Sequence, residues 1–272
     1  MRDVWRGRLT KGLIVSKRLL ALTCAVFVTF AATAVAASGR GDGSKPASAA
    51  VTKLVTGVPL TTLNAVGLGK EWNQFTVTKL HGAPLKAKGV PEVLVGTLAW
   101  CPHCAVTNYA LAIALSRFGK LRGLRVIDTG PLFKSEPHVK GISFYKTRYA
   151  SPALSFRDVI IQNNRGKIFE KPTKAERKVF KASDGQGIFP AIDVGGAYAF
   201  INSAFDPKVI AHKSARQIAQ SLADPTSPIA IDIDGFANLL TAAMCTQTGQ
   251  VPSAVCTSPG VAAAAMKLPP AT

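Results

Sequence analysis

The chain has 272 residues, with 33 Lys or Arg against 15 Asp or Glu and a formal net charge of +18. Hydrophobic residues make up 47% and charged residues 18%, so the chain can bury a core and is neither a disulfide mini-protein nor a disordered polymer. A positive charge of this size ordinarily indicates nucleic acid or an anionic surface as the partner. No nucleic-acid-binding motif occurs in the sequence, so we expect no nucleic-acid partner.

The N-terminal segment has the pattern of a targeting sequence. Residues 1–18 carry six Lys or Arg residues and one Asp, and residues 19–37 are an uncharged apolar run. A basic flank before such a run directs the chain into a membrane and keeps its N-terminus in the cytoplasm. Residues 1–37 are therefore a signal anchor, since the run approaches the length of a span of about 20 residues, or a signal peptide cleaved near Ala36. In both cases we expect the rest of the chain outside the cytoplasm, held by a single N-terminal span or secreted.

Composition divides the remaining chain into three segments. Residues 38–50 are rich in Gly, Ser and Ala and predict a flexible linker, residues 51–256 predict one domain, and residues 257–272 predict a disordered tail. Basic charge is concentrated in residues 117–181, with 16 basic and 5 acidic side chains. Outside the cell such a surface would meet anionic lipid or an anionic wall polymer. The alternative is a solvated basic surface without a specific partner.

A strand that runs into Cys-Pro-His-Cys carries the main chemical signal. Residues 92–98 are a short apolar run rich in β-formers, typical of a buried strand, and apolar residues recur at helical spacing after Cys104. Pro102 suits the first position of a helix. Cys101 is therefore predicted at the helix N-terminus, where unpaired N–H groups and the helix dipole stabilise a thiolate. This order of strand, Cys-x-x-Cys and helix is the thioredoxin-like arrangement of an active site.

The motif predicts a division of roles. We expect Cys101 to be the exposed nucleophile and Cys104 to resolve the mixed disulfide. The His103 imidazolium would stabilise the Cys101 thiolate further and make the disulfide oxidising. Trp100 would shield the site and contact a substrate chain, or simply fill the core. A zinc site would need further ligands at a suitable spacing, so we expect no metal and no cofactor, whereas a structural disulfide that never cycles stays open.

Cysteines near the C-terminus predict a second disulfide. Cys245 and Cys256 lie after an apolar helix predicted over residues 235–244, and in an oxidising compartment they would form a structural bond. The alternative is a second redox pair that relays electrons with the Cys-Pro-His-Cys pair. Cys24 lies in the apolar N-terminal run and is expected to be inert.

The residues around the motif resemble a known family. Trp100 to Ala105 and Ala114 to Gly119 resemble the Cys-Pro-aromatic-Cys-Ala motif and the Ala-Leu-Ser-Arg-Phe-Gly helix of the thioredoxin-like proteins grouped as domain of unknown function 929. Phe144 to Tyr149, with Ser155 and Phe156, looks like the Tyr/Ser/Phe-rich segment of that family. The tetrapeptide itself is similar to that of the DsbA-type thiol oxidants.

The resemblance implies an α/β thioredoxin-like fold with a central mixed sheet, an inserted β-rich segment and a C-terminal helical extension. It also implies that Phe189–Pro190, at the start of a hairpin predicted over residues 187–201, lies against the cysteine pair, with Pro190 presenting the substrate backbone and Phe189 contacting the substrate. The other expected elements are strands over 124–129, 141–145 and 155–161, a helix over 174–182 with a Thr173–Glu176 capping box, and a helix over about 207–222.

The expected function is that of an extracytoplasmic, membrane-anchored thiol–disulfide oxidoreductase acting on the thiols and disulfides of exported proteins, with a redox partner that could lie in the membrane. The alternative is a non-catalytic thioredoxin scaffold that binds anionic lipid, wall polymer or a protein partner. Exposure of Cys101 at a groove would favour the enzyme, and its burial would favour the scaffold.

Overall fold

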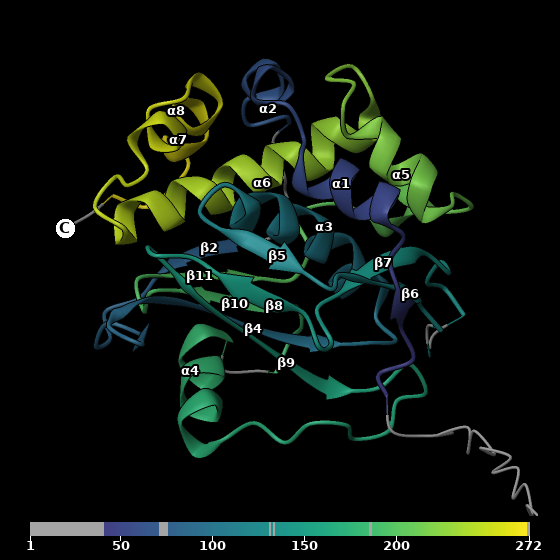
Figure 1. Ribbon diagram of the computed structural model, residues 1–272. Coiled ribbons are helices and arrows are strands. Elements are labelled where there is room, and N and C mark those ends of the chain that lie inside the picture. Colours follow the sequence, from purple (N-terminus) through teal and green to yellow (C-terminus); the bar gives the residue numbers. More distant parts are fainter. Residues whose placement is uncertain (1–40, 71–75, 131, 133, 185–186, 271–272) are drawn as a thin grey trace, which may run out of the picture. The chain divides into compact units, whose positions relative to one another are not determined.

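A mixed β-sheet with helices on both faces organises the fold (Figure 1). The computed structural model describes residues 41–70, 76–130, 132, 134–184 and 187–270, which belong to one unit, residues 40–272. The predicted signal sequence over residues 1–37, with Cys24, lies outside the described residues. The sheet contains β2 (Thr76–Lys79), β11 (Tyr198–Ile201), β10 (Ala191–Val194), β4 (Val90–Leu98), β3 (Lys86–Ala87) and β9 (Ser155–Gln162).

β4 is the strand on which the rest of the sheet is built. It pairs antiparallel with β10 and β3 and parallel with β9. Its side chains alternate between two layers: Val93 and Val95 face helices α3 (Pro102–Ser116) and α6 (Pro228–Gln247), whereas Leu94 packs with Phe180 of α4 (Lys174–Asp184) on the other face. The α/β class and the mixed sheet expected from the sequence are therefore confirmed.

Shorter helices lie beside α6, on the side of the sheet away from α4 (Figure 1). They are α1 (Ala49–Thr56), α2 (Leu60–Val66), α5 (Ala215–Ser221), α7 (Ser253–Cys256), α8 (Pro259–Ala265) and the 3-10 turn η1 (Pro207–Ile210). The single helix expected over 207–222 is divided into η1 and α5. His212 lies between them with φ of 61°, a left-handed conformation that cannot continue a right-handed helix.

The strand expected over 124–129 exists as β6 (Arg125–Asp128), but it does not join the central sheet. It pairs with β1 (Lys45–Pro46) and β7 (Lys140–Ser143) in a separate sheet, and β5 (Lys120–Arg122) pairs with β8 (Arg148–Ala150). The parallel neighbour of β4 is instead β9. β9 has 8 residues and pairs with β4 from Glu92 to Leu98, whereas β6 has 4 residues. Strands β5–β8 form the β-rich insertion between α3 and β9.

The two segments expected to be flexible contain ordered elements. In the predicted linker over 38–50, Asp42 is fully buried, accepts hydrogen bonds from Ser44 and Ser143, and is followed by β1. In the predicted tail over 257–272, α8 buries Val261 in the core. Small and polar residues are common in linkers, but they also allow close packing and cap helices, as Ser48 does for α1.

Helix α6 is the core helix of the unit. Among the described residues it is the one helix that is long and apolar enough to cross a membrane. Most of its residues are buried inside the protein, and Phe236 packs edge-on against Phe200 of β11 and against Phe205. Its apolar composition is thus explained by packing between α3 and the shorter helices.

A disulfide joins Cys245 at the end of α6 to Cys256 of α7. It lies near the C-terminal end of α3, because Arg117, the residue after that helix, donates a hydrogen bond of 3.1 Å to Ser258 Oγ. Cys101 lies at the opposite end of α3, whose 15 residues span about 22 Å at 1.5 Å per residue. The separation of the two cysteine pairs favours a structural bond over an electron relay.

We expect the double substitution Cys245→Ala with Cys256→Ala to lower the free energy of unfolding by up to about 3 kcal/mol, because the bond closes a short loop in the unfolded chain. Urea unfolding monitored by circular dichroism measures the change in midpoint. An unchanged midpoint would contradict a structural role, and a mixed disulfide of either residue with Cys101 or Cys104, detected by mass spectrometry after thiol blocking, would support the relay.

Candidate active site

The cysteine pair lies where β4 passes into α3. β4 ends at Leu98, whose carbonyl oxygen accepts a 3.0 Å hydrogen bond from the N–H of Cys101. Cys101 is the N-cap of α3, and its sulfur accepts the N–H of Cys104 at 3.4 Å. Pro102 occupies the first turn, where its missing N–H is not needed. Both thiols are free, so the structure is that of the reduced pair.

The two thiols differ in acidity. The pKa of Cys101 is lowered, mainly by a hydrogen bond from the Cys104 thiol and further by the backbone N–H groups of Cys104 and His103, which outweigh desolvation. The pKa of Cys104 is raised well above its ordinary value, mainly by burial and then by the hydrogen bond that it donates to Cys101. Cys101 is therefore the more acidic of the two thiols, and the hydrogen bond that Cys104 donates stabilises the Cys101 thiolate when it forms.

His103 has a different environment from the one expected. Its Nδ1 lies 2.6 Å from Ser203 Oγ and its Nε2 lies 3.3 Å from Glu136 Oε2. Because the Ser203 hydroxyl donates to the carbonyl oxygen of Phe205, it accepts from Nδ1 of His103. The charge of Glu136 raises the pKa of Cys101, so the backbone of His103, more than its ring, favours the thiolate.

Pro190 and Phe189 lie on different sides of the site. The Phe189–Pro190 peptide bond is cis, and Ala191 pairs with Gly96, so Pro190 lies opposite Thr97 at the end of β4 from which Cys101 follows. Phe189 packs against Phe180, with ring centroids 6.1 Å apart, on the α4 face of the sheet. Its position away from α3 indicates a core role and does not support the expected substrate contact.

Trp100 is tied to the end of β9. Its Nε1 donates a 2.6 Å hydrogen bond to Gln162 Oε1, and the N–H of Ala99 donates to the carbonyl oxygen of Gln162 at 2.8 Å. The indole is half-buried, so it leaves part of its surface beside the cysteine pair. This position suits both of the roles considered for it, shielding the site and filling the core.

Asp158 is a carboxylic acid that sequence analysis did not single out. It lies on β9 opposite Val95, and Thr97 Oγ1 donates a 2.9 Å hydrogen bond to its Oδ1. Burial is the main cause that raises the pKa of Asp158 to about 7. A carboxylate within the otherwise strand-like run over 155–162 was the available signal, since an acidic side chain at the centre of a buried strand is rarely structural.

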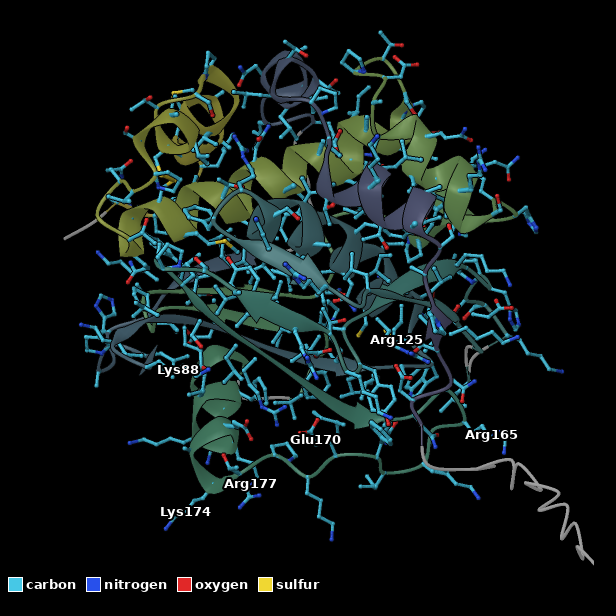
Figure 2. All side chains as sticks on the ribbon, in the orientation of Figure 1. Lys88, Arg125, Arg165, Glu170, Lys174 and Arg177 are labelled. Carbon is cyan, nitrogen blue, oxygen red and sulfur yellow. A yellow bond between two sulfur atoms is a disulfide. The ribbon has the colours of Figure 1, made fainter. Side chains whose placement is uncertain are left out.

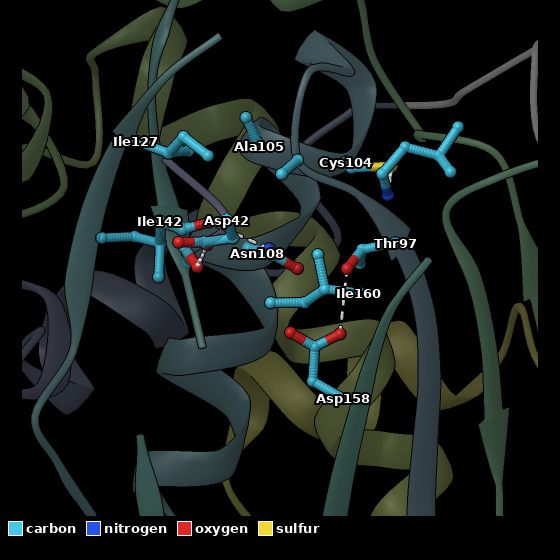
Figure 3. A pocket seen from close by; sticks show the side chains of 12 residues that line it. Asp42, Thr97, Cys104, Ala105, Asn108, Ile127, Ile142, Asp158 and Ile160 are labelled. Atoms are coloured by element: carbon cyan, nitrogen blue, oxygen red, sulfur yellow. Dashed lines mark hydrogen bonds between the residues drawn. The ribbon is translucent and has the colours of Figure 1, made fainter. Parts of the chain in front are cut away.

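Asp158 and Cys104 line the same small cavity (Figure 3). Its volume is about 10 Å³, near the lower limit for one water molecule. Among the described residues, Asn108 Oδ1 and Asp158 Oδ2 have no hydrogen-bond partner. The lining includes Cys104, Asp42, Asn108, Ser143 and Asp158. The negative charge of Asp158 contributes to the raised pKa of Cys104, so the two groups are electrostatically linked.

The arrangement provides a nucleophile, a resolving thiol and a buried acid within one motif. Cys101 can attack or be attacked, Cys104 can close a disulfide with it, and Asp158 can exchange a proton near pH 7. Only 6% of the Cys101 surface is exposed. We had expected its sulfur to be exposed at an open groove. Among the described residues, no group of three His, Cys, Asp or Glu side chains could hold a metal ion.

We expect the alkylation rate of Cys101 to rise with pH around a midpoint below that of an ordinary thiol, about 8.5. Substitution Cys104→Ala removes the donating thiol and should raise this midpoint by more than any other single change at the pair. Iodoacetamide labelling followed by mass spectrometry at each pH measures it, and the Cys245–Cys256 variant serves as the control. A midpoint that Cys104→Ala leaves unchanged would show that the thiol hydrogen bond does not set the acidity of Cys101.

Part of the chain is similar to a described protein family. Residues 76–184 match the family model described as "Domain of unknown function (DUF929)". No curated protein and no solved structure matches the chain. The matched segment contains β4, the cysteine motif, α3, β9 and α4 and ends before Pro190. The match supports the resemblance of this segment to the domain-of-unknown-function family.

Proposed function

We propose that the protein is an extracytoplasmic thiol–disulfide oxidoreductase that acts on exported proteins. The observation that carries this proposal is the contrast between the two thiols of one motif: the pKa of Cys101 is lowered and that of Cys104 is raised. Thiol–disulfide exchange needs one thiolate to react and one thiol to resolve. The N-cap position of Cys101 and the burial of Cys104 provide this division of roles.

We propose also that the fold is thioredoxin-like. Three features support this: β4 and β9 are parallel and joined through α3, the cysteine motif begins α3, and the antiparallel hairpin β10–β11 pairs with β4. Pro190 begins that hairpin at the level of Thr97, next to the end of β4. In this arrangement Pro190 shapes the site beside Cys101. Its own backbone has little to offer a substrate chain, because proline has no N–H and the carbonyl oxygen of Pro190 accepts a 2.9 Å hydrogen bond from the N–H of Asn202.

The exchange proceeds in two balanced steps. A substrate thiolate attacks Cys101 Sγ of the oxidised pair, the Cys101–Cys104 bond breaks, and Cys104 leaves and takes up a proton. A second substrate thiolate then attacks the substrate sulfur of the mixed disulfide, and Cys101 leaves as a thiolate stabilised at the start of α3. The substrate loses two electrons and the cysteine pair gains them; reversal of these steps reduces a substrate disulfide, and a membrane redox partner would restore the starting state.

Asp158 serves this exchange as the proton donor and acceptor for Cys104. Cys104 is buried, and among the described residues its sulfur accepts one hydrogen bond, from the N–H of Leu98 at 3.4 Å, so it has no direct access to solvent protons. Asp158, with its pKa of about 7, is partly protonated at neutral pH and lines the same cavity. A proton can pass between the two groups through one water molecule, for which the cavity has room.

The proposed location rests on the N-terminal sequence pattern and on the second disulfide. The basic residues 1–18 and the apolar residues 19–37 are expected to direct the chain to the membrane and to hold it there by one span. The Cys245–Cys256 bond belongs to the kind that persists in oxidising compartments. The proposed substrates, exported proteins that form or exchange disulfides, occur in the same compartment.

The low exposure of Cys101 favours a second candidate function. A non-catalytic thioredoxin-like scaffold would not need an open cysteine, and its basic surface would bind anionic lipid, wall polymer or a protein partner. In that case the pair Cys101–Cys104 would contribute only to packing at the start of α3.

Substitution Cys101→Ser tests the enzyme against the scaffold. We expect wild type to accelerate the oxidative refolding of a reduced model substrate, and Cys101→Ser to lose this activity to below about 1% because the nucleophile is absent. Insulin reduction measures the reverse direction. The Cys245–Cys256 variant, checked for folding by circular dichroism, should retain activity. Equal rates for wild type and Cys101→Ser would exclude the oxidoreductase.

Substitution Asp158→Asn tests the proton path. We expect the rate of substrate oxidation to show a step near pH 7 in wild type, and Asp158→Asn to remove that step and to slow the reaction by about a hundredfold, the lower range for general acid–base catalysis. Asp193, whose pKa burial raises to about 6, lies on β10 and gives the matched control Asp193→Asn, which should keep the step. A pH profile that Asp158→Asn leaves unaltered would remove Asp158 from the mechanism.

Because its pKa is raised in the folded state, Asp158 should also affect stability. The contribution of Asp158 to the free energy of unfolding is fully present below the unfolded pKa of about 3.9. It is lost as the pH rises from there through the folded pKa of about 7. Asp158→Asn should therefore gain stability over wild type at pH 8 but not at pH 4, as measured by urea unfolding. Loss of stability at pH 8 would indicate that the carboxylate is structurally required.

A further inference from the structure

Basic side chains gather along one edge of the protein, formed by the turn after β9 and the start of α4. Figure 2 shows Arg165, Lys174 and Arg177 on this edge, on the opposite side of the sheet from α6 and α8. Lys167 and Lys171 belong to the same stretch of chain and are also exposed. We call these five residues the basic edge: Arg165, Lys167, Lys171, Lys174 and Arg177.

The basic edge keeps its positive charge because the neighbouring carboxylates are used elsewhere. Glu170 and Glu176 both form ion pairs with Arg157, and Glu176 also accepts the N–H of Thr173 at 2.6 Å. Among the described residues, none of the five cations of the basic edge forms an ion pair with a carboxylate. The edge therefore presents uncompensated charge to its surroundings.

Two apolar side chains are exposed within the same surface. Ile168 is 62% exposed between Lys167 and Lys171, and Leu132 is 54% exposed. Leu132 lies against the turn that carries Arg165, because a Cβ on Gly166 would come within 2.9 Å of its Cδ1. Apolar side chains among cations suit a boundary where charged headgroups meet hydrocarbon, since the aliphatic group enters the lipid while the cations stay at the headgroups.

The N-terminal end of the folded unit is attached beside this surface. The carbonyl oxygen of Asp42 accepts a 2.9 Å hydrogen bond from the N–H of Asn164, the residue before Arg165. The apolar run of the sequence ends at Ala37, five residues before Asp42, and five residues reach at most about 18 Å. A chain anchored by that run would keep the basic edge within reach of the membrane.

We propose that the basic edge, with Ile168 and Leu132, is the surface by which the protein binds an anionic lipid bilayer. The short distance along the chain from Ala37 to Asp42 supports this proposal only if residues 1–37 are the membrane anchor of the proposed function. The charge of the basic edge and its exposed apolar side chains support it without that anchor. Binding at this edge orients the start of α1 and the helical layer away from the bilayer, because they lie on the opposite face of the sheet. The thiol site lies near the start of the basic edge, because Gln162 accepts the Nε1–H of Trp100. None of the five cations, Ile168 or Leu132 takes part in the proposed thiol exchange, so the two proposals can fail independently.

The test uses residues 40–272, which form a compact unit without the N-terminal segment, and vesicles of phosphatidylcholine with 30 mol% phosphatidylglycerol. We expect co-sedimentation that weakens as salt is raised and is absent with pure phosphatidylcholine. The double substitution Arg165→Glu with Lys167→Glu should weaken binding at least about thirtyfold, because each cation at such a surface contributes about 1 kcal/mol and 1.4 kcal/mol is tenfold. The matched control is Lys53→Glu with Arg216→Glu on α1 and α5, which should bind like wild type.

Insertion of the edge is measured with a tryptophan in place of Ile168. The emission of Ile168→Trp should shift to the blue and be quenched by brominated lipid, whereas Met266→Trp, at a position that is 82% exposed next to α8, should show neither effect. Equal loss of binding in both charge variants, or an unquenched Ile168→Trp, would overturn the proposal. Binding of soluble poly(glycerol phosphate) as tightly as the vesicles, without quenching, would assign the edge to wall polymer instead of lipid.

Discussion

The burial of α3 is the constraint on which the rest of the structure depends. Every residue of this helix except His103 and Ser116 is buried, between the central sheet on one side and α6 on the other. A helix held on both sides cannot shift its first turn, so its unpaired N–H groups point at a fixed position. Cys101 occupies that position as the N-cap, and the acidity of its thiol follows from the packing of the whole helix.

The same burial separates the chemical roles of the residues around the motif. Cys104, one turn into α3, is removed from solvent and kept as a thiol, and Asp158, beneath it on β9, is kept partly protonated near neutral pH. The charged groups that are not part of this system lie elsewhere: Glu170 and Glu176 are bound to Arg157. The buried carboxylic acid and the exposed Lys and Arg side chains thus occupy different layers, so the surroundings of the cysteine pair and the basic surface are formed by different residues.

Much of the fold could be predicted because it depends on local signals. The apolar run before Cys101, Pro102 at the helix start and the capping box from Thr173 to Glu176 each specify an element without reference to distant residues; the reciprocal bonds of that box are present at 3.1 and 2.6 Å. The pairing of strands could not be predicted in this way. β6 has the composition of a strand, but only the competition with β9 for the free side of β4 decides which of them enters the central sheet.

By itself, the sequence determined where α3 begins and that a cysteine lies at its start, since both depend on spacing within a few residues. Only the tertiary structure decided what surrounds that thiol. Asp158, Glu136 and Ser203 come from three separate segments, and no periodicity links them to Cys101. Sheet register brings Asp158 under the motif through the pairing of β9 with β4, and the ends of two loops place Glu136 and Ser203 on either side of His103. Such long-range contacts arise from the packing of apolar surfaces far from the site. The local sequence pattern therefore indicated the candidate cysteine pair but not the residues that surround it.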